Sequence, residues 1–245
     1  MPFRLDAPTF ERRFRPEGLD SQASILLFDG DAPAGVCLIA RQGWTSRVAA
    51  MAIAPDFRSQ GVGKRLMQRV IQEARDRKDR RLVLEVIEQN PPAIGLYESV
   101  GFAKTRRLVG YRRGAQSGSP FELREIDPAE VVRLQSVECS TDLPWDFRPE
   151  TLTLKTNTVG LSLDDQAYAL ITETPERVVL WSVFALRDHR RAGRGRKIVE
   201  AIAARNPEAS LMTPVALPDD HFPKFFAALG FEHHPISQFE MELKF

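Results

Sequence analysis

The feature that most constrains this chain is an internal repeat. An Arg-x-x-Gly-x-Gly motif followed by a basic residue occurs at Arg58–Lys64 and again, 132 positions later, at Arg190–Arg196. In each copy an apolar strand pattern precedes the motif, an amphipathic helical pattern follows it, and the copy ends in Gly-Phe. The repeat is far longer than the ~20–50 residues of a solenoid unit. The sequence therefore predicts two related domains.

Composition fits this interpretation and excludes several function classes. The chain has 245 residues, enough for two small domains, with 43% hydrophobic and 27% charged residues. A net charge of +1 gives no general attraction to nucleic acid or to a membrane surface. There is no signal-peptide pattern and no apolar run of about 18 residues. Since Cys37 and Cys139 are too few for a disulfide framework, we expect a cytoplasmic protein.

Periodicity and turn residues predict the following elements. The first domain (1–116) should contain strands at 24–28, 35–40, 46–53, 81–87 and 103–113, and helices at 63–78 and 92–99. The second (117–245) should contain strands at 121–125, 159–163, 167–172, 178–185 and 210–215. A flexible linker is expected at 114–120, where the chain reads Gly-Ala-Gln-Ser-Gly-Ser-Pro.

The two copies differ at their N-terminal ends. Arg190 lies 69 residues after the strand expected to start at Phe121, but Arg58 is too close to residue 1 for an equivalent strand. We therefore expect the first domain to lack its first strand and part of its first helix. A sheet edge exposed in this way can seek a partner, which leaves a homodimer open.

The first glycine motif has the chemistry of a pyrophosphate-binding loop. Glycines let a backbone approach a ligand closely, and the N–H groups at a helix start point towards an anion. Arg58, Lys64 and the neutral donor Gln60 would add to this site. A dinucleotide-binding loop has a different glycine order, and a Walker loop requires Ser or Thr after its lysine, where this chain has Arg65. The remaining alternative is an ordinary glycine turn between a strand and a helix.

A second motif gives the family resemblance. Residues 84–86 read Leu-Glu-Val, and residues 90–102 read Asn-x-x-Ala-x-x-Leu-Tyr-Glu-x-x-Gly-Phe. Together with the glycine loop, this string resembles the GNAT superfamily of N-acetyltransferases, and over residues 20–113 it is similar to the ribosomal-protein alanine N-acetyltransferase branch. The resemblance implies an α/β fold of two GNAT-type domains. Each would have a central, mostly antiparallel sheet with two splayed parallel strands and flanking helices.

The resemblance also implies acetyl-CoA as co-substrate. Its pantetheine arm would pair with the backbone at Ala52 and Ile53, and Asn90 and Ala93 would line the thioester end. The pyrophosphate would lie on the loop residues Arg58, Gln60, Gly61, Val62, Gly63 and Lys64.

Two residues are candidates for the catalytic chemistry. Tyr97 carries a hydroxyl whose ordinary pKa, about 10, is close to that of a thiol leaving group, so it could protonate the departing thiolate. The alternative is an ordinary helix aromatic. Glu85 interrupts an apolar strand, where burial would raise its pKa towards neutrality. The matching glutamate of the family branch is a general base, whereas the alternative here is a carboxylate facing solvent.

The second copy has lost most of these residues. Counting back from its Gly-Phe places Phe226 where the first copy has Tyr97, and Asp219 where it has Asn90, and no strand with an embedded glutamate precedes them. Its basic loop is more simply an inherited feature than a working cofactor site. His233 and His234 have no accompanying ligands at metal spacing, so no metal site is predicted.

The predicted function is acetyl transfer from acetyl-CoA to a primary amine, by direct attack in a ternary complex, in the first domain. The acceptor could be a small-molecule amine or a peptide amine. Two alternatives remain open: a CoA-binding regulatory module without turnover, and a protein N-terminal acetyltransferase.

Overall fold

In the computed structural model, residues 6–139 and 142–245 are described. The chain divides into two compact units that do not follow the order of the sequence. The first unit comprises the chain up to Arg107 together with Ser237–Phe245, and the second comprises Leu108–Ile236. The C-terminal segment thus belongs to the first unit.

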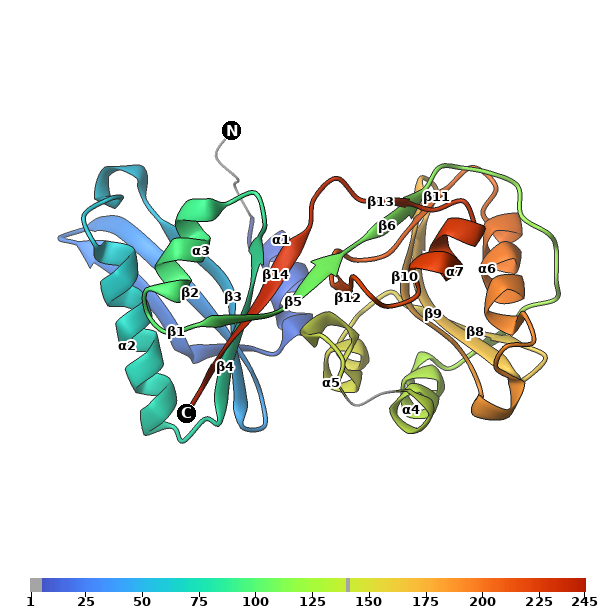
Figure 1. Cartoon of the computed structure of the whole chain (residues 1–245), viewed down its shortest axis with the longest axis horizontal. Helices are drawn as coiled ribbons and strands as arrows, with labels where there is room; N and C mark the ends of the chain where they lie inside the picture. Colours follow the sequence, from blue (N-terminus) through green and yellow to red (C-terminus); the bar gives the residue numbers. More distant parts are fainter. Residues whose placement is uncertain (1–5, 140–141) are drawn as a thin grey trace. The chain divides into compact units, whose positions relative to one another are not determined.

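The first unit is a sheet with helices against it (Figure 1). Its strands follow the order β1-β2-β3-β4-β14-β5 across the sheet, and the two-residue strand β12 (Leu217–Pro218) pairs with the last residues of β5, Leu108 and Val109. The elements are α1 (Ala7–Phe14), the 3-10 turn η1 (Arg15–Glu17), β1 (Leu19–Asp29), β2 (Ala32–Gln42), β3 (Thr45–Ile53), η2 (Pro55–Phe57), α2 (Val62–Asp76), β4 (Arg81–Ile87), α3 (Pro91–Glu98), β5 (Ala103–Val109) and β14 (Gln238–Lys244).

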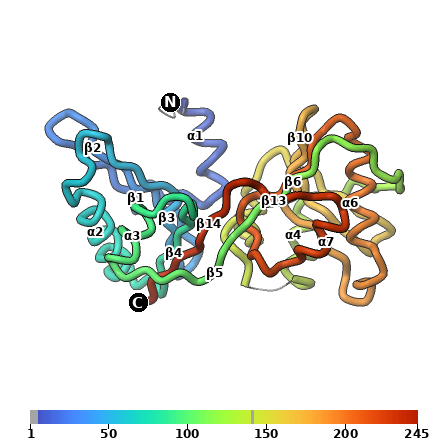
Figure 2. Tube along the Cα trace, turned by 45° about the horizontal axis from the view of Figure 1, so that its top comes forward, coloured from blue at the N-terminus to red at the C-terminus, as the bar shows by residue number. Residues whose placement is uncertain are grey.

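Helices α2 and α3 cover one face of this sheet, where both views show them side by side (Figures 1 and 2). The apolar stripe predicted for the first helix is buried there, at Leu66, Met67, Val70, Ile71 and Ala74. It packs against alternate residues of β2, β3 and β4, including Ile39, Val48 and Leu84. Alternation along the strands directs the next residues, such as Arg47 and Glu85, to the opposite face.

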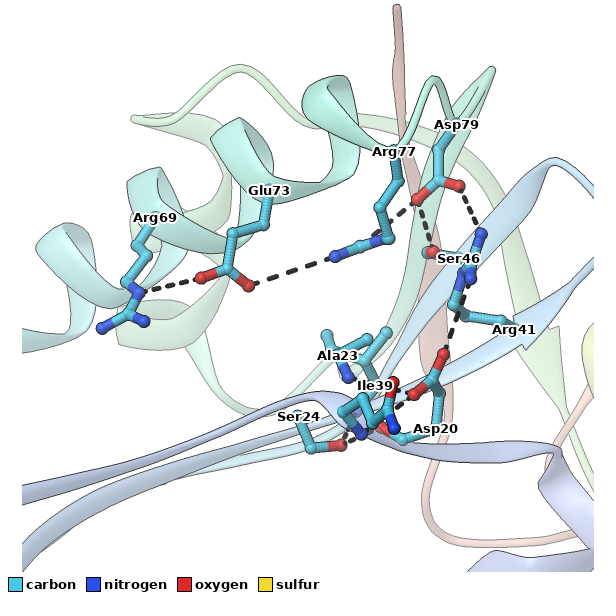
Figure 3. A network of polar contacts seen from close by, with 11 residues as sticks. Asp20, Ala23, Ser24, Ile39, Arg41, Ser46, Arg69, Glu73, Arg77 and Asp79 are labelled. Atoms are coloured by element: carbon cyan, nitrogen blue, oxygen red, sulfur yellow. Dashed lines mark hydrogen bonds and ion pairs between the residues drawn. The ribbon is translucent and has the colours of Figure 1, made fainter.

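A buried carboxylate ties α2 to the strands at the end where β3 and β4 begin (Figure 3). Asp79, in the turn after α2, accepts a hydrogen bond from the Ser46 hydroxyl at 2.6 Å and pairs with Arg41 at 3.2 Å and Arg77 at 3.3 Å. Several partners offset the cost of burying this charge. The network fixes where β4 starts relative to β3.

The second unit is also built on a seven-stranded sheet, and helices pack on both of its faces (Figure 1). Strand order is β13-β6-β11-β10-β9-β8-β7. Helix α6 packs on one face, and α4 and α5 pack on the other against Tyr168, Leu170 and Phe184. The elements are β6 (Tyr111–Arg113), β7 (Arg124–Ile126), α4 (Pro128–Glu138), η3 (Trp145–Phe147), α5 (Pro149–Thr153), β8 (Val159–Leu163), β9 (Ala167–Thr174), β10 (Arg177–Ala185), η4 (Arg187–His189), α6 (Arg194–Arg205), β11 (Ser210–Met212), β12 (Leu217–Pro218), α7 (Pro223–Ala228) and β13 (Glu232–His233).

The middle of the chain departs from one expectation. Strands were predicted around 103–113, and the structure has two there: β5 ends before Gly110, β6 joins the second sheet, and β14 lies beside β4 in the first. The segment 114–120 is not a free linker. Gly118 lies directly on α6, where an added Cβ would meet the carbonyl oxygen of Glu200 and, at 2.8 Å, the amide nitrogen of Ala204.

The predicted α/β class, with two GNAT-type domains built on mostly antiparallel sheets, is confirmed by this architecture. In the described residues, β1 forms an edge of the first sheet. None of the helices in the described residues has the length and apolarity needed to cross a bilayer.

Candidate functional site

The site begins where two parallel strands separate. In the described residues, β3 and β4 pair from Thr45 with Arg81 to Val48 with Leu84 and no further, although β3 continues to Ile53 and β4 to Ile87. On its other side β3 stays paired with β2 through Ile53, and β4 stays paired with β14 through Ile87. Each strand is therefore held by its outer neighbour while a gap in the pairing opens between them.

The glycine loop follows directly from the open end of β3. Arg58 is extended, Ser59 has φ 58°, and Gly61 is left-handed with φ 74° immediately before α2. No side chain in the described part of the chain caps the N-terminus of α2. The first N–H groups of a helix have no partner within it, so those at Val62, Gly63 and Lys64 remain for a ligand.

The loop is held in shape by its own side chains. The Arg58 Nε donates to the Ile53 carbonyl oxygen at 2.9 Å, Gln60 donates to the Asp56 carbonyl oxygen at 2.6 Å, and Arg65 donates to the Gln60 carbonyl oxygen at 3.1 Å. The loop therefore needs little rearrangement to present its N–H groups. Arg58, Gln60 and Lys64 are exposed, as a role at a ligand surface requires.

A hollow of about 330 Å³ lies beside the end of β3. Three residues predicted to touch the cofactor, Ala52, Ile53 and Arg58, contribute to its lining. Gly63 lets α2 approach closely, since an added Cβ would lie 3.3 Å from Leu96 and 3.4 Å from Met51. The tight contact fixes the start of α2 against α3 and β3.

Helix α3 begins at the open end of β4. Asn90 is its N-cap, and its side-chain oxygen accepts from the Ala93 backbone N–H at 3.3 Å. Asn90 is exposed and Ala93 is half-buried. The structure therefore gives Asn90 a helix-capping role in addition to the cofactor contact predicted for it.

Tyr97 projects from α3 into the core under the sheet. Its hydroxyl donates to the Met51 sulfur at 3.9 Å, a weak contact, and its ring lies 6.0 Å from that of Phe102. Burial, with a smaller contribution from Cys37, raises the pKa of Tyr97 to about 12. The phenol is therefore protonated at neutral pH, the form that a proton donor requires.

Glu85 faces the other side of the sheet, at the point where the strands part. It follows Leu84, the last paired residue of β4. The Arg47 Nε lies 2.7 Å from its Oε2, and the Arg47 Nη1 lies 2.6 Å from Oε2 of Glu17. These side chains are 9%, 10% and 11% exposed for Glu85, Arg47 and Glu17 respectively. The ion pair with Arg47 fixes the direction of the Glu85 carboxylate.

Arg47 and Glu17 were missed at the sequence level, although a signal was available. Arg47 interrupts the strand that leads to the loop just as Glu85 interrupts the next one. Buried arginines and glutamates nearly always have partners, so two interrupted neighbouring strands predict an ion pair.

The second unit keeps the backbone of the loop. Arg190 is extended at φ −70°, ψ 157° against −74°, 159° for Arg58. Gly193 has φ 74°, ψ 5° against 74°, 2° for Gly61. Its strands also pair in parallel only from Arg177 with Ser210 to Val179 with Met212, where β11 ends, while β10 stays paired with β9 through Ala185.

The surroundings of this second loop are different. The Arg187 Nη2 donates to the Val137 carbonyl oxygen at 2.6 Å, the Arg187 backbone N–H donates to the Glu138 carboxylate at 2.8 Å, and Arg190 donates to the Glu138 carbonyl oxygen. The end of α4 therefore occupies the guanidinium groups of the loop.

In the second unit, stacked aromatic rings fill the position equivalent to Tyr97. Phe226 stacks on Tyr111 with centroids 4.1 Å apart and also contacts the rings of Phe225 and Phe231. By strand register, Pro214 stands in the place of Glu85. Asp219 does not take the place of Asn90 at a helix start, since α7 begins at Pro223. The described residues contain no group of three His, Cys, Asp or Glu that could hold a metal ion.

The features of the first unit fit coenzyme A. The parted strands expose backbone for a pantetheine amide, the uncapped helix start and left-handed Gly61 suit a pyrophosphate, and Tyr97 is a buried hydroxyl on the helix that follows.

Comparison with known proteins supports the same family. Residues 2–102 match the model of the Acetyltransferase (GNAT) family. The chain is 26% identical over 110 residues to the N-terminal acetyltransferase B complex catalytic subunit NAA20 of Arabidopsis thaliana, covering 43% of this chain and 63% of that protein. It is 44% identical over 52 residues to the [ribosomal protein bS18]-alanine N-acetyltransferase of Escherichia coli, covering 21% of this chain and 35% of that protein. Each match thus spans less than two thirds of the relative.

A solved structure resembles the chain over both units. A tandem GNAT protein from the clavulanic acid biosynthesis pathway superimposes with a TM-score of 0.63 at 18% identity, covering 91% of this chain and 83% of that one. At this identity the likeness concerns the fold. The predicted resemblance to the GNAT superfamily, with a first domain similar to the alanine N-acetyltransferase branch, is confirmed.

Proposed function

Since the first unit resembles the GNAT acetyltransferases, we propose that it transfers the acetyl group of acetyl-CoA to a primary amine. The observation that carries this proposal is that the parted strands β3 and β4 lead to the uncapped glycine loop and to the helix of the buried Tyr97, respectively. The loop would hold the pyrophosphate through Arg58, Gln60, Gly61, Val62, Gly63 and Lys64. Ala52 and Ile53 would pair with the pantetheine arm, and Asn90 and Ala93 would lie near its thioester end.

The two candidate catalytic groups suit direct transfer in a ternary complex. The amine attacks the thioester carbonyl carbon, a C–N bond forms and the C–S bond breaks. Glu85 accepts the proton that the amine loses, and Tyr97 gives its proton to the sulfur. Because the pKa of Tyr97 is raised to about 12, the phenol stays protonated until the thiolate forms.

The second unit is proposed to be non-catalytic. Phe226 carries no donor where the first unit has Tyr97, and Arg187 and Arg190 are bonded to the end of α4. Its preserved loop backbone is then an inherited feature of a related domain.

Replacement of Tyr97 with Phe tests the proposal. The hydroxyl contacts only a sulfur at 3.9 Å among the described residues, so Tyr97→Phe should leave folding stability nearly unchanged. Loss of a general acid should lower kcat by about 10²–10⁴. Steady-state acetylation, CoA calorimetry and thermal melting on both proteins measure the three quantities. Retained CoA binding with background turnover in both proteins would favour a CoA-binding module instead.

The acceptor class needs its own panel. Peptides with free N-termini and small primary amines should be compared at equal concentration with acetyl-CoA. The relatives NAA20 and the bS18-alanine enzyme are named for N-terminal acetylation, whereas the likeness to a tandem protein does not specify an acceptor. A strong preference for peptides would identify an N-terminal acetyltransferase.

A further inference from the structure

We propose that Arg47 is a positioning residue for the transfer reaction, holding Glu85 ionised and aimed at the point where β3 and β4 separate. The inference rests on the proposed function for the role of Glu85 as base. It assigns roles to two residues outside the glycine loop and the Tyr97 motif, Arg47 and its second partner Glu17.

The geometry places the ion pair across the vertex of the parted strands. Arg47 is paired in register with Val83, one position before the last pair of the two strands, and Glu85 is one position after that pair. The Arg47 Nε to Glu85 Oε2 distance of 2.7 Å therefore links β3 to β4 where their backbone pairing ends. A carboxylate held by a fixed guanidinium nitrogen has fewer orientations than one on an unrestrained side chain.

Arg47 is in turn held by Glu17. The Arg47 Nη1 to Glu17 Oε2 distance is 2.6 Å, and Glu17 comes from the turn η1 just before β1. Two nitrogens of one planar group thus bind two carboxylates, which lysine cannot reproduce with the same geometry. The cluster carries two negative charges and one positive charge, a balance that suits an incoming ammonium group.

Other charged groups face Glu85 within the first unit. Glu240 of β14 is its register partner, so the two side chains share a face of the sheet. Glu240 is paired with Arg106 of β5 at 2.6 Å. Without Arg47, Glu85 would face the carboxylates of Glu17 and Glu240 and the guanidinium of Arg106, and the loss of its own ion pair would let it take up a proton at higher pH.

The chemistry gives the expected direction. As base, Glu85 must be a carboxylate when the amine loses its proton, so activity falls at acid pH as Glu85 is protonated. Arg47 keeps this acid limb at low pH. An opposite charge at this distance stabilises a carboxylate, so removal of Arg47 should move the acid limb to higher pH.

The test compares pH profiles of kcat/KM, with acetyl-CoA and the best amine of the acceptor panel. Arg47→Met should move the acid limb of the profile up by one pH unit or more. At pH values below the wild-type limb, kcat/KM of the variant should then be at least tenfold lower than that of the wild type. Arg47→Lys should give a smaller shift than Arg47→Met because lysine retains the positive charge. Glu17→Gln should move the limb down, since it removes a like charge from the cluster. If Arg47→Met does not fold, Glu17→Gln carries the test.

Arg41→Met is the matched control. Arg41 pairs with the buried Asp79 at the end of the strands remote from their separation, so its loss should affect stability and leave the acid limb in place. The same acid limb in Arg47→Met or in Glu17→Gln as in the wild type would overturn the proposal.

A second readout separates this proposal from the proposed function. Carboxyl-¹³C NMR of glutamate-labelled protein follows the titration of Glu85, assigned with Glu85→Gln, without turnover. An unchanged Glu85 titration in both variants overturns the role of Arg47. A shifted titration in a protein that acetylates no amine overturns the proposed function alone.

Discussion

Because the C-terminal strand β14 belongs to the first unit, we predict that a substitution near the end of the chain destabilises that unit. Met241 is fully buried, lies opposite Leu84 in the register of β14 with β4, and packs in the core beneath α2 and α3. Met241→Ala removes three heavy atoms from this core. Substitutions of this kind cost about 2–5 kcal/mol, a large part of the ~5–15 kcal/mol of a typical domain.

Hydrogen exchange with mass spectrometry locates the loss. In the regime where exchange follows the unfolding equilibrium, 2–5 kcal/mol corresponds to exchange about 30- to 5,000-fold faster. We expect this acceleration in residues 62–87, which include α2 and β4. Phe231→Ala is the control, because Phe231 lies in the core of the second unit although only ten positions away in sequence. If Met241→Ala instead accelerates exchange in β9 and β10 and leaves β4 protected, the assignment of β14 to the first unit is wrong.

Two further predictions concern the loop and the core. Gly61→Ala should weaken CoA binding in calorimetry, because Gly61 has φ +74° and a side chain in this conformation costs roughly 1–2 kcal/mol. The control is Gly95→Ala in α3, where an added Cβ has no atom within 4 Å, so this variant should bind CoA like the wild type. Burial raises the pKa of Cys37 to about 12 from an ordinary 9.0, so the contribution of the thiol to folding stability is present below pH 9 and is lost as pH rises towards 12. In denaturant melts, the free energy of unfolding of the wild type should therefore fall above pH 9 in a way that Cys37→Ala does not show. The same pH dependence in both proteins would contradict this reasoning.

Much of the fold follows from local patterns. Residues 81–87 and 159–163 were predicted to the residue as strands, because both are short apolar runs with clear boundaries, and the amphipathic stripe of α2 was read from its spacing. The partners of the last strands could not be read in this way. The segments at 111–113 and 238–244 each carry a strand pattern, but nothing local to them specifies which of two similar sheets they join.

The candidate site divides along the same line. Its loop was recognisable because left-handed backbone favours glycine, as at Gly61 and Gly193, and the structure repeats those dihedrals in both units. The pairing of Arg47 with Glu85 depends on the register of β3 and β4, which a motif does not contain. Arg47 and Glu85 each interrupt an apolar strand in the sequence, however, and an unpaired buried charge costs several kcal/mol. That cost was reason enough to predict that the two side chains pair.

The comparison of the two units suggests which part of the site is hardest to lose. Both retain a short parallel strand pair ahead of the loop and the same loop dihedrals, since these follow from strand pairing and glycine positions that also shape the fold. The second unit has exchanged the hydroxyl for Phe226 and the carboxylate for Pro214, changes that a core accepts without cost to its packing. Restoring the phenol alone, as Phe226→Tyr, should therefore produce no acetyl transfer from the second unit when the first unit carries Tyr97→Phe. The reason is that Arg187 remains bonded to Val137 and Arg190 to Glu138. Recovery of turnover in that double variant would show that the loss of the hydroxyl alone had disabled the second unit.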